Sequence, residues 1–257
     1  MMTDSPIKSE THFGGQVLEL RLARPKANIL DAAMTQALTE ALEEARGEHD
    51  LKAILIEGEG DHFSFGASVE EHLPGSYQSM ILGFHRIFRT MLELGVPTVA
   101  AVRGQCLGGG LELAMFCTRV FASHNAKLGQ PEIQLAVLPP IASFFLAERV
   151  GRPRAEELCL SGRIVGAEDA MRLGLVDHVS DDPHLAALNW IEEALLRHSA
   201  AALRQTNFAL RMELQERFER TIPRIEELYF DELMQTKDAV EGLQSFLEKR
   251  PAKWSNR

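Results

Sequence analysis

"RGQCLGGGLELAMF" (residues 103–116) sets three glycines before an apolar run with helical spacing, and Glu112 lies two residues inside that run. Glycine allows positive φ and lets a ligand approach the backbone closely. A helix start adds unpaired N–H groups and the positive end of the helix dipole. A tight turn before a core helix explains the glycines equally well. The stretch lacks the last glycine of GxGxxG and the Lys-Ser/Thr of a P-loop, so a phosphate cradle is disfavoured.

Strands and helices are expected to alternate on both sides of this stretch. The apolar runs at 52–60 and 97–104 predict buried strands, and 31–45 predicts a helix capped by Asp31. This order predicts an α/β fold with parallel strands. Further strands are predicted at 16–25, where Pro25 ends the run, and at 119–124, and a further helix is predicted at 78–94.

The chain beyond Phe145 is expected to be nearly all helix. Apolar residues recur there at three- and four-residue spacing. A helical tail of this length suits packing against a neighbouring subunit. We therefore expect a core at 1–195 that holds the site and an oligomerisation region at 196–257. The predicted helices lie at 152–162, 166–175, 184–200, 201–219 and 241–249.

Composition excludes several classes of protein. With 257 residues and 45% apolar content, the chain can form one large domain. It contains no apolar run of membrane-spanning length and begins without a secretory signal pattern, so we expect a cytoplasmic protein. A net charge of −10 disfavours nucleic acid as a partner. Cys106, Cys117 and Cys159 lack CxxC spacing and the nine histidines lack HExxH, so neither a disulfide nor a bound metal is expected.

Two further segments are expected to join the glycine run in one pocket. "HFSFGAS" (62–68) follows the strand at 52–60 much as the glycines follow the strand at 97–104. Ligands bind at the carboxyl ends of parallel strands, and one N–H from each loop would form an oxyanion hole. Glu132 follows Glu112 by a helix, a strand and a turn, so the chain can return to the same pocket. Two carboxylates in an apolar pocket push their pKa values apart, whereas either Glu alone could be a solvated surface charge.

Together these segments resemble the crotonase, or enoyl-CoA hydratase, superfamily over nearly the whole chain. The segments that carry the resemblance are "RLARPKANILDAAM", "FSFGAS", "RGQCLGGGLELAMFCTRVFAS", "KLGQPEIQLAVLP", "LSGRIVGAEDAMRLGLVDHV" and "FLEKRPAKW". The resemblance implies a spiral of ββα units with a C-terminal helical trimerisation region. It also implies a homotrimer or homohexamer that takes an acyl-CoA thioester and needs no cofactor beyond the CoA of its substrate.

The resemblance also assigns residues. The backbone N–H groups of Phe65 and Gly109 would hold the thioester oxygen, and Glu112 and Glu132 would activate water and transfer protons. Two filled Glu positions favour a hydratase over isomerases and hydrolases of the same fold. Lys249 would reach a CoA phosphate, in its own or a neighbouring subunit. The other expected substrate-binding residues are Lys26, Ala27, Ser64, Gly66, Ala67, Ser68, Gly108, Pro139, Pro140 and Phe144.

The chain departs from the common pattern at two places. The first loop has Ser68 where an Asp is usual, and "LPPIASFF" replaces the usual glycine-rich turn after Glu132. These features resemble the hydratases that convert cyclohexa-1,5-diene-1-carbonyl-CoA to 6-hydroxycyclohex-1-ene-1-carbonyl-CoA in anaerobic benzoyl-CoA degradation. The rigid Pro139-Pro140 pair and Phe144 would then form a wall for a flat ring, unless the Phe side chains belong to the core. The alternatives are a straight-chain enoyl-CoA hydratase and a non-catalytic, RNA-binding protein of the same fold.

Overall fold

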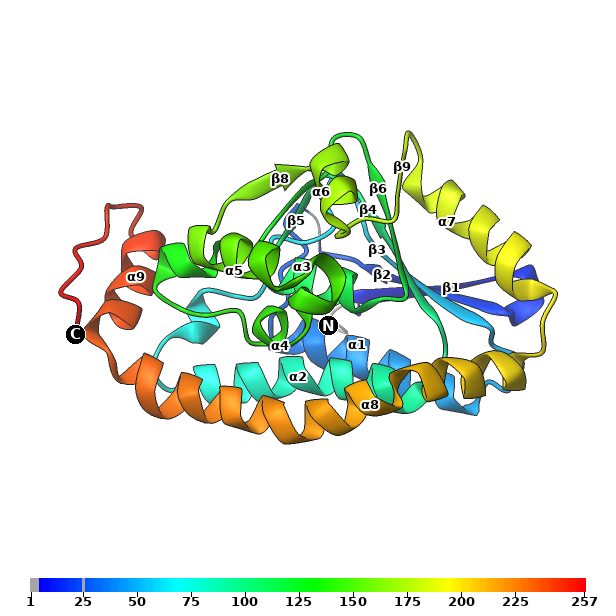
Figure 1. Ribbon diagram of the computed structural model, residues 1–257, viewed down its shortest axis with the longest axis horizontal. Coiled ribbons are helices and arrows are strands. Elements are labelled where there is room, and N and C mark those ends of the chain that lie inside the picture. The colour runs from blue at the N-terminus through cyan, green and yellow to red at the C-terminus, as the bar shows by residue number, and fades with distance from the viewer. Residues whose placement is uncertain (1–4, 25) are drawn as a thin grey trace.

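The computed structural model describes residues 5–24 and 26–257 (Figure 1). Its strands are β1 Ile7–His12, β2 Val17–Leu22, β3 Ala53–Gly58, β4 Thr98–Val102, β5 Gln105–Leu107, β6 Arg119–Ser123, β7 Lys127–Gly129, β8 Ile164–Gly166 and β9 His178–Ser180. Its helices are α1 Ala32–Glu44, α2 Tyr77–Leu94, α3 Gly109–Phe116, α4 Pro140–Val150, α5 Arg152–Ser161, α6 Ala167–Leu173, α7 Pro183–Ile191, α8 Ala200–Glu227 and α9 Lys237–Leu247.

The main sheet has six strands in the order β1-β2-β3-β4-β6-β9. Among the described strands of this sheet, β1 and β2 pair antiparallel and the other neighbours pair parallel, so the predicted parallel α/β arrangement is confirmed. β3 alternates its side chains between two cores, because Ile54 and Ile56 pack with the α1 and α2 side while Ala53 and Leu55 pack with α7. Both faces of the central strands are therefore buried, as the continuous apolar runs predict.

A second, three-stranded sheet, β5-β7-β8, lies beside the first. Here β4 leads into β5 and then α3, and β6 leads into β7 and then the 3₁₀ helix Pro131–Leu135 and α4. Each turn of this spiral delivers one loop to the same region. Ser64 forms an isolated parallel bridge with Cys106 of β5, so the first glycine loop joins the second sheet at that edge.

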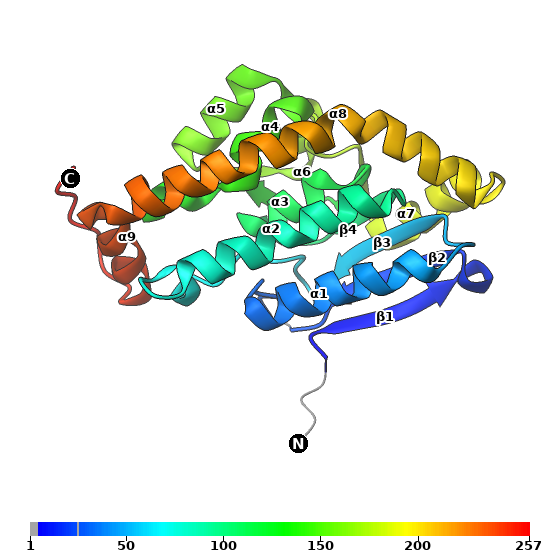
Figure 2. The same cartoon turned by 90° about the horizontal axis from the view of Figure 1, so that it is seen from below.

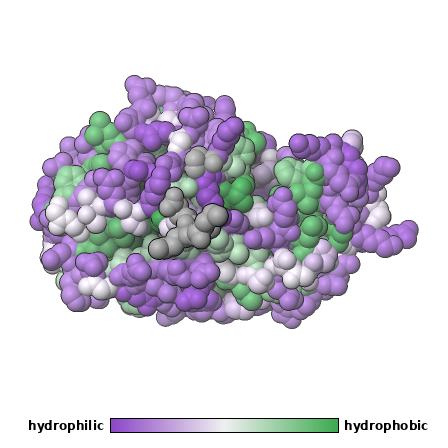
Figure 3. Space-filling view, turned by 180° about the vertical axis from the view of Figure 1, so that it is seen from behind, coloured by the Kyte–Doolittle hydropathy of each residue, from purple (hydrophilic) through white to green (hydrophobic). Residues whose placement is uncertain are grey.

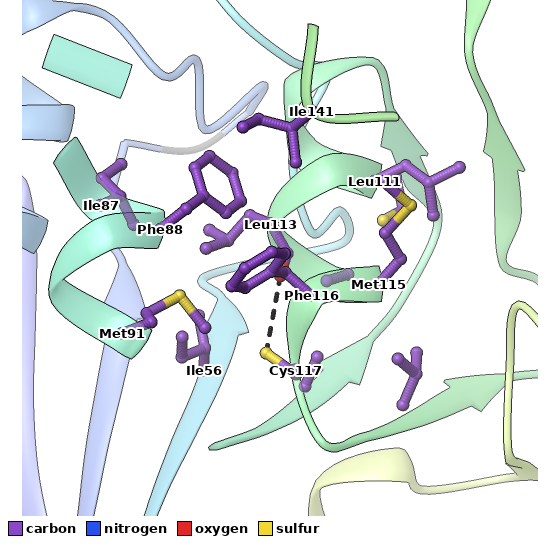
Figure 4. Close-up of a cluster of buried hydrophobic side chains, with 14 of the residues drawn as sticks. Ile56, Ile87, Phe88, Met91, Leu111, Leu113, Met115, Phe116, Cys117 and Ile141 are labelled. Atoms are coloured by element: carbon purple, nitrogen blue, oxygen red, sulfur yellow. Dashed lines mark hydrogen bonds between the residues drawn. The ribbon is translucent and has the colours of Figure 1, made fainter. Parts of the chain in front are cut away.

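Helix α3 is buried along its whole length, as its composition requires. Leu113 and Phe116 project toward α2, whereas Leu111 and Met115 project from the opposite side of the helix (Figure 4). The Phe116 ring meets that of Phe88 of α2 with ring centroids 5.0 Å apart. A helix that is apolar all round belongs in a core. Glu112 is consequently carried into the interior on a helix whose residues are all buried.

Helix α8 runs alongside α2 (Figure 2). It also contacts α4, so the C-terminal region packs on this chain's own core. Hydrophilic residues cover most of the face opposite that of Figure 1, with smaller hydrophobic patches among them (Figure 3).

Some predicted boundaries are wrong. β1, β5 and β7 were not expected, and β8 and β9 interrupt the region predicted to be nearly all helix. Four of these five strands have only three residues, which is too short for an alternating pattern to be recognised. β2 ends at Leu22, and Pro25, which was expected to end that strand, lies outside the described residues. The predicted Asp31 cap of α1 is confirmed, because its carboxylate accepts a hydrogen bond from Met34 N at 2.8 Å.

Candidate active site

The first loop and the glycine run before α3 are joined by backbone hydrogen bonds. Ser64 N donates to Gln105 O at 3.0 Å, and Leu107 N donates to Ser64 O at 3.0 Å. Gly110 permits this approach, because a Cβ at that position would lie 2.8 Å from Ser64 Cβ. The two loops thus form one rigid unit at the ends of β3 and β4.

This unit presents two backbone N–H groups, but one of them differs from the prediction. Phe65 N donates to Ala27 O at 2.9 Å, so the expectation that Phe65 supplies a free donor is wrong. Gly66 has φ +102°, which turns the chain and redirects the next N–H. Ala67 N lies 3.3 Å from the place where a Cβ on Gly109 would be, and neither Ala67 N–H nor Gly109 N–H has an acceptor within the described ranges. The free pair is therefore Ala67 and Gly109.

Glu112 is buried, at 2% exposure, and is held by the start of α4. Ala142 N donates to Glu112 Oε1 at 2.7 Å, and Ile141 N also donates to the carboxylate. Burial raises the pKa of Glu112 to about 7, and the two N–H groups limit that rise. Proline at the first position of α4 suits this role, because the first N–H groups of a helix have no partner inside the helix.

The segment that replaces the usual glycine-rich turn therefore positions Glu112. Pro139 and Pro140 are buried at the start of α4. Phe144 turns toward α8, where its ring meets Phe218 at 5.6 Å and the Arg217 guanidinium at 4.9 Å. The expectation that Phe144 lines the substrate site is wrong, since this ring is part of the α4–α8 packing. The alternative that the Phe side chains belong to the core holds for Phe144.

Glu132 lies on the 3₁₀ helix Pro131–Leu135 and is half-buried. Burial and the charge of Glu112 raise its pKa well above the ordinary value. With its amide nitrogen turned toward the carboxylate, the buried Gln130 donates to both Glu132 oxygens at 3.0 Å. The sequence analysis missed Gln130, although its place two residues before Glu132 was a usable signal.

Gly108 explains how Glu132 reaches the other site residues. A Cβ on Gly108 would lie 2.8 Å from Glu132 Oε1, so any side chain there would displace the carboxylate. Gly108 N donates to Gly129 O at 2.9 Å and is not available to a ligand. When one of Glu112 and Glu132 is ionised, its charge disfavours ionisation of the other, so the two carboxyl groups titrate as a coupled pair.

The residues expected to line a CoA groove fall into two groups. Lys26 is exposed on its turn, and Lys249 is exposed after α9, so both are accessible to a ligand. Ser64 is fully buried, and its Oγ donates to Asn28 O at 2.7 Å and accepts from Gly66 N at 3.0 Å. The expectation that Ser64 binds substrate is wrong for its side chain, which fixes the loop. Ser68 Oγ likewise accepts from Glu71 N at 3.4 Å.

Asn28 is a buried residue that the sequence analysis missed. Its Nδ2 donates to Glu59 O at 3.0 Å and His62 O at 2.9 Å, which ties the expected CoA-binding turn to the first loop. The side chains of the two histidines near this loop contact backbone atoms. His62 Nδ1 accepts from Gln105 N at 3.2 Å, and His72 Nδ1 lies 2.6 Å from Ser68 O.

A separate charged cluster lies between the main sheet and α7. Carboxylate and imidazole atoms of Glu19, Glu57 and His184 lie within 4.8 Å of one another, as do those of Glu10, His12 and Glu19. Arg21 Nε donates to Glu57 Oε1 at 2.8 Å, and its guanidinium also pairs with Glu19. Glu19 and Glu57 already form ion pairs with the Arg21 guanidinium, and this arrangement is typical of an ion-pair network rather than of a metal site.

The two N–H donors and the two carboxyl groups at the loop ends can together support acid–base chemistry on a bound carbonyl compound. Two adjacent N–H donors can stabilise an oxygen that gains negative charge. Two carboxyl groups whose pKa values are raised by burial can take a proton from one reacting group and give a proton to another. Within the described residues, no helix is both long and apolar enough to cross a membrane.

Comparisons with known proteins agree with this geometry. The enoyl-CoA hydratase/isomerase family matches residues 12–257. The chain is 48% identical to the cyclohexa-1,5-dienecarbonyl-CoA hydratase of Thauera aromatica over 98% of both sequences. It is 34% identical to a probable enoyl-CoA hydratase of Rhizobium meliloti, over 95% of this chain and 96% of the relative. An enoyl-CoA hydratase structure from Mycobacterium avium subsp. paratuberculosis superposes with a TM-score of 0.84, at 27% identity, over 97% and 98% of the two chains.

Proposed function

The chain belongs to the enoyl-CoA hydratase/isomerase family, and we propose that it adds water to the ring of cyclohexa-1,5-diene-1-carbonyl-CoA. The observation that carries a hydratase function is the pair of buried Glu112 and half-buried Glu132 close to the free N–H groups of Ala67 and Gly109. The 48% identity to the Thauera aromatica enzyme supports the cyclic substrate.

The thioester oxygen would lie between Ala67 N and Gly109 N. Attack of water on the β-carbon moves electrons toward that oxygen, so the two donors stabilise the transition state more than the ground state. Losing one such donor costs about 3 kcal/mol in comparable sites. The rigid hydrogen bonds between the two loops keep both N–H groups in place before the substrate arrives.

The two carboxyl groups would divide the proton transfers. Glu112 is held by two backbone N–H groups, which favour its ionised form, so it takes a proton from water. Glu132 has less support for its charge and holds the proton. The hydroxyl then bonds to the β-carbon, and the Glu132 proton goes to the far end of the dienolate. One water is consumed, and the pair regains its starting charge when Glu112 passes its proton to Glu132.

We further propose a homotrimer, or a dimer of trimers, in the cytoplasm. Lys249 would then be free to meet a CoA phosphate of a neighbouring subunit, since its side chain is exposed beyond α9. Light scattering of the purified chain measures the assembly. Thermal stabilisation by the thioester, compared with RNA, separates an enzyme from an RNA-binding protein of this fold.

The deciding experiment measures hydration of the cyclic dienoyl-CoA and of crotonyl-CoA by wild-type protein, Glu112→Gln and Glu132→Gln. We expect preference for the cyclic substrate and loss of about 10²–10⁴-fold in kcat in each variant, with thioester binding retained. Preference for crotonyl-CoA would identify a straight-chain hydratase. Near-normal turnover in either variant would remove that Glu from the mechanism.

A further inference from the structure

Tyr229 lies in the turn that follows α8, the π-helical segment Leu228–Glu232, and its side chain is fully buried. The C-terminal end of α8 lies beside the start of α2 (Figures 1 and 2). Tyr229 packs there in an apolar cluster with Met80, Ile81 and Val137. Ala67 and Leu138 border the same cluster. Tyr229 thus shares one cluster with the loop that carries a free N–H and with the segment that follows Glu132.

The hydroxyl of Tyr229 has no hydrogen-bond partner among residues 5–24 and 26–257. Buried tyrosines usually find a partner for this group, because an unpaired buried hydroxyl destabilises the fold. Phenylalanine would fill the same apolar space without this cost. The presence of the hydroxyl therefore indicates a hydrogen-bond acceptor that forms in another protonation state of the enzyme.

The charged groups around this hydroxyl identify that acceptor. Burial raises the pKa of Tyr229, and the charges of Glu132, Glu112 and Tyr77, in that order, raise it further. The phenol therefore stays neutral and can donate a hydrogen bond, but it cannot serve as a base. Of the two carboxylates, Glu112 already accepts from two N–H groups of α4, while Glu132, among the described residues, accepts from Gln130 and from its own backbone N–H. A carboxylate has about four acceptor positions, so Glu132 has room for another donor.

We propose that Tyr229 is a positioning residue for Glu132, and that its hydroxyl donates a hydrogen bond to the Glu132 carboxylate once that group has lost its proton. Protonated Glu132 needs little support, whereas the ionised form, beside Glu112, needs donors. Tyr229 and Gln130 would hold the ionised carboxylate from two sides. This inference rests on the proposed function for its catalytic consequence, but the hydrogen bond itself can be detected without any substrate.

The test compares Tyr229→Phe with wild type, using Tyr77→Phe as the matched control. Tyr77 belongs to the same cluster, its ring lies 6.5 Å from that of Tyr229, and it is partly exposed. An infrared titration of the protonated carboxyl stretch, assigned with Glu132→Gln, follows ionisation directly. We expect Tyr229→Phe to shift the Glu132 titration to higher pH and Tyr77→Phe to leave it unchanged. Cys159 does not interfere, because burial and the charges of Glu132 and Glu112 raise the pKa of its thiol to about 12.

Kinetics give the second measurement. We expect kcat of Tyr229→Phe to fall about tenfold or more with KM nearly unchanged, as loss of a hydrogen bond to a charged group predicts. The pH limb of kcat should move with the infrared titration. An unshifted Glu132 titration in Tyr229→Phe would overturn the proposal, even if thermal stability fell. A shifted titration in a protein that hydrates neither thioester would refute the proposed function and leave the hydrogen bond established.

Discussion

Gly108→Ala tests whether the glycine run serves the carboxylate pair. The new Cβ would lie 2.8 Å from Glu132 Oε1, whereas ordinary contacts begin at 3.4 Å, so the carboxylate must move by 0.6 Å. A misplacement of about 1 Å costs about 10²-fold in rate, so we expect kcat to fall by about tenfold. Gly108 also has φ +50° and ψ −127°, and strained backbone of this kind costs about 1–3 kcal/mol.

The assay must separate displacement of the carboxylate from backbone strain. Gly75→Ala is the control, because Gly75 has φ +101° and a Cβ there would meet nothing within 4 Å. Both variants should lower Tm by several degrees, at about 2–4 °C per kcal/mol for a chain of this size. Only Gly108→Ala should lower kcat for thioester hydration. If Gly108→Ala kept wild-type kcat while losing the same stability as the control, the close approach to Glu132 would have no catalytic role.

Two predictions concern stability against pH, measured by denaturant unfolding at a series of pH values. Burial raises the pKa of Glu112 from 4.5 to about 7, so the native state keeps a proton that the unfolded chain releases, and stability should fall as pH rises through that window. Glu112→Gln should flatten this slope, and an unchanged slope would contradict the assignment. Although burial opposes it, hydrogen bonds from His184 and Arg21 lower the pKa of Glu57 to about 2, so this network should lose its contribution as pH falls from 4.5 toward 2. The hydrogen bond with Glu57 raises the pKa of His184. The stability that protonated His184 contributes is therefore present at low pH and is lost as pH rises through the raised pKa. Glu57→Gln should remove both the Glu57 and the His184 contributions to the pH dependence of stability.

The parallel sheet and the convergence of the two loops could be predicted from sequence, because each depends on a local pattern. Apolar runs followed by glycine mark strands that end at one edge of a sheet, and residues 52–60 and 97–104 do form β3 and β4. Long segments in which strand patterns and helix patterns follow one another predict this type of fold strongly. Three-residue strands such as β8 and β9 give no such signal, because their pairing with β7 and β6 depends on segments distant in the chain.

The free N–H in the first loop could not be assigned from sequence. The motif shows Gly66 but not the direction of the N–H groups around it. That direction depends on the hydrogen bond from Phe65 N to Ala27 O, which joins residues 38 positions apart, and on the positive φ of Gly66. The prediction for Phe144 was wrong for a similar reason, since the direction of its ring depends on Phe218 of α8, which lies more than seventy residues later in the chain. Contacts between distant segments decide such details, and local pattern does not contain them.

The structure gives the two glutamates unequal support, and this inequality is what a hydratase needs. Glu112 is fixed by backbone N–H groups at the start of α4, which cannot rotate away, so its charge is stabilised before substrate binds. Glu132 depends on the Gln130 side chain and stands on a single 3₁₀ turn. A base benefits from rigid placement near the attacked carbon, whereas an acid that must protonate the far side of a ring benefits from some freedom. The same asymmetry makes Glu132 the carboxylate for which one additional donor, Tyr229, matters most.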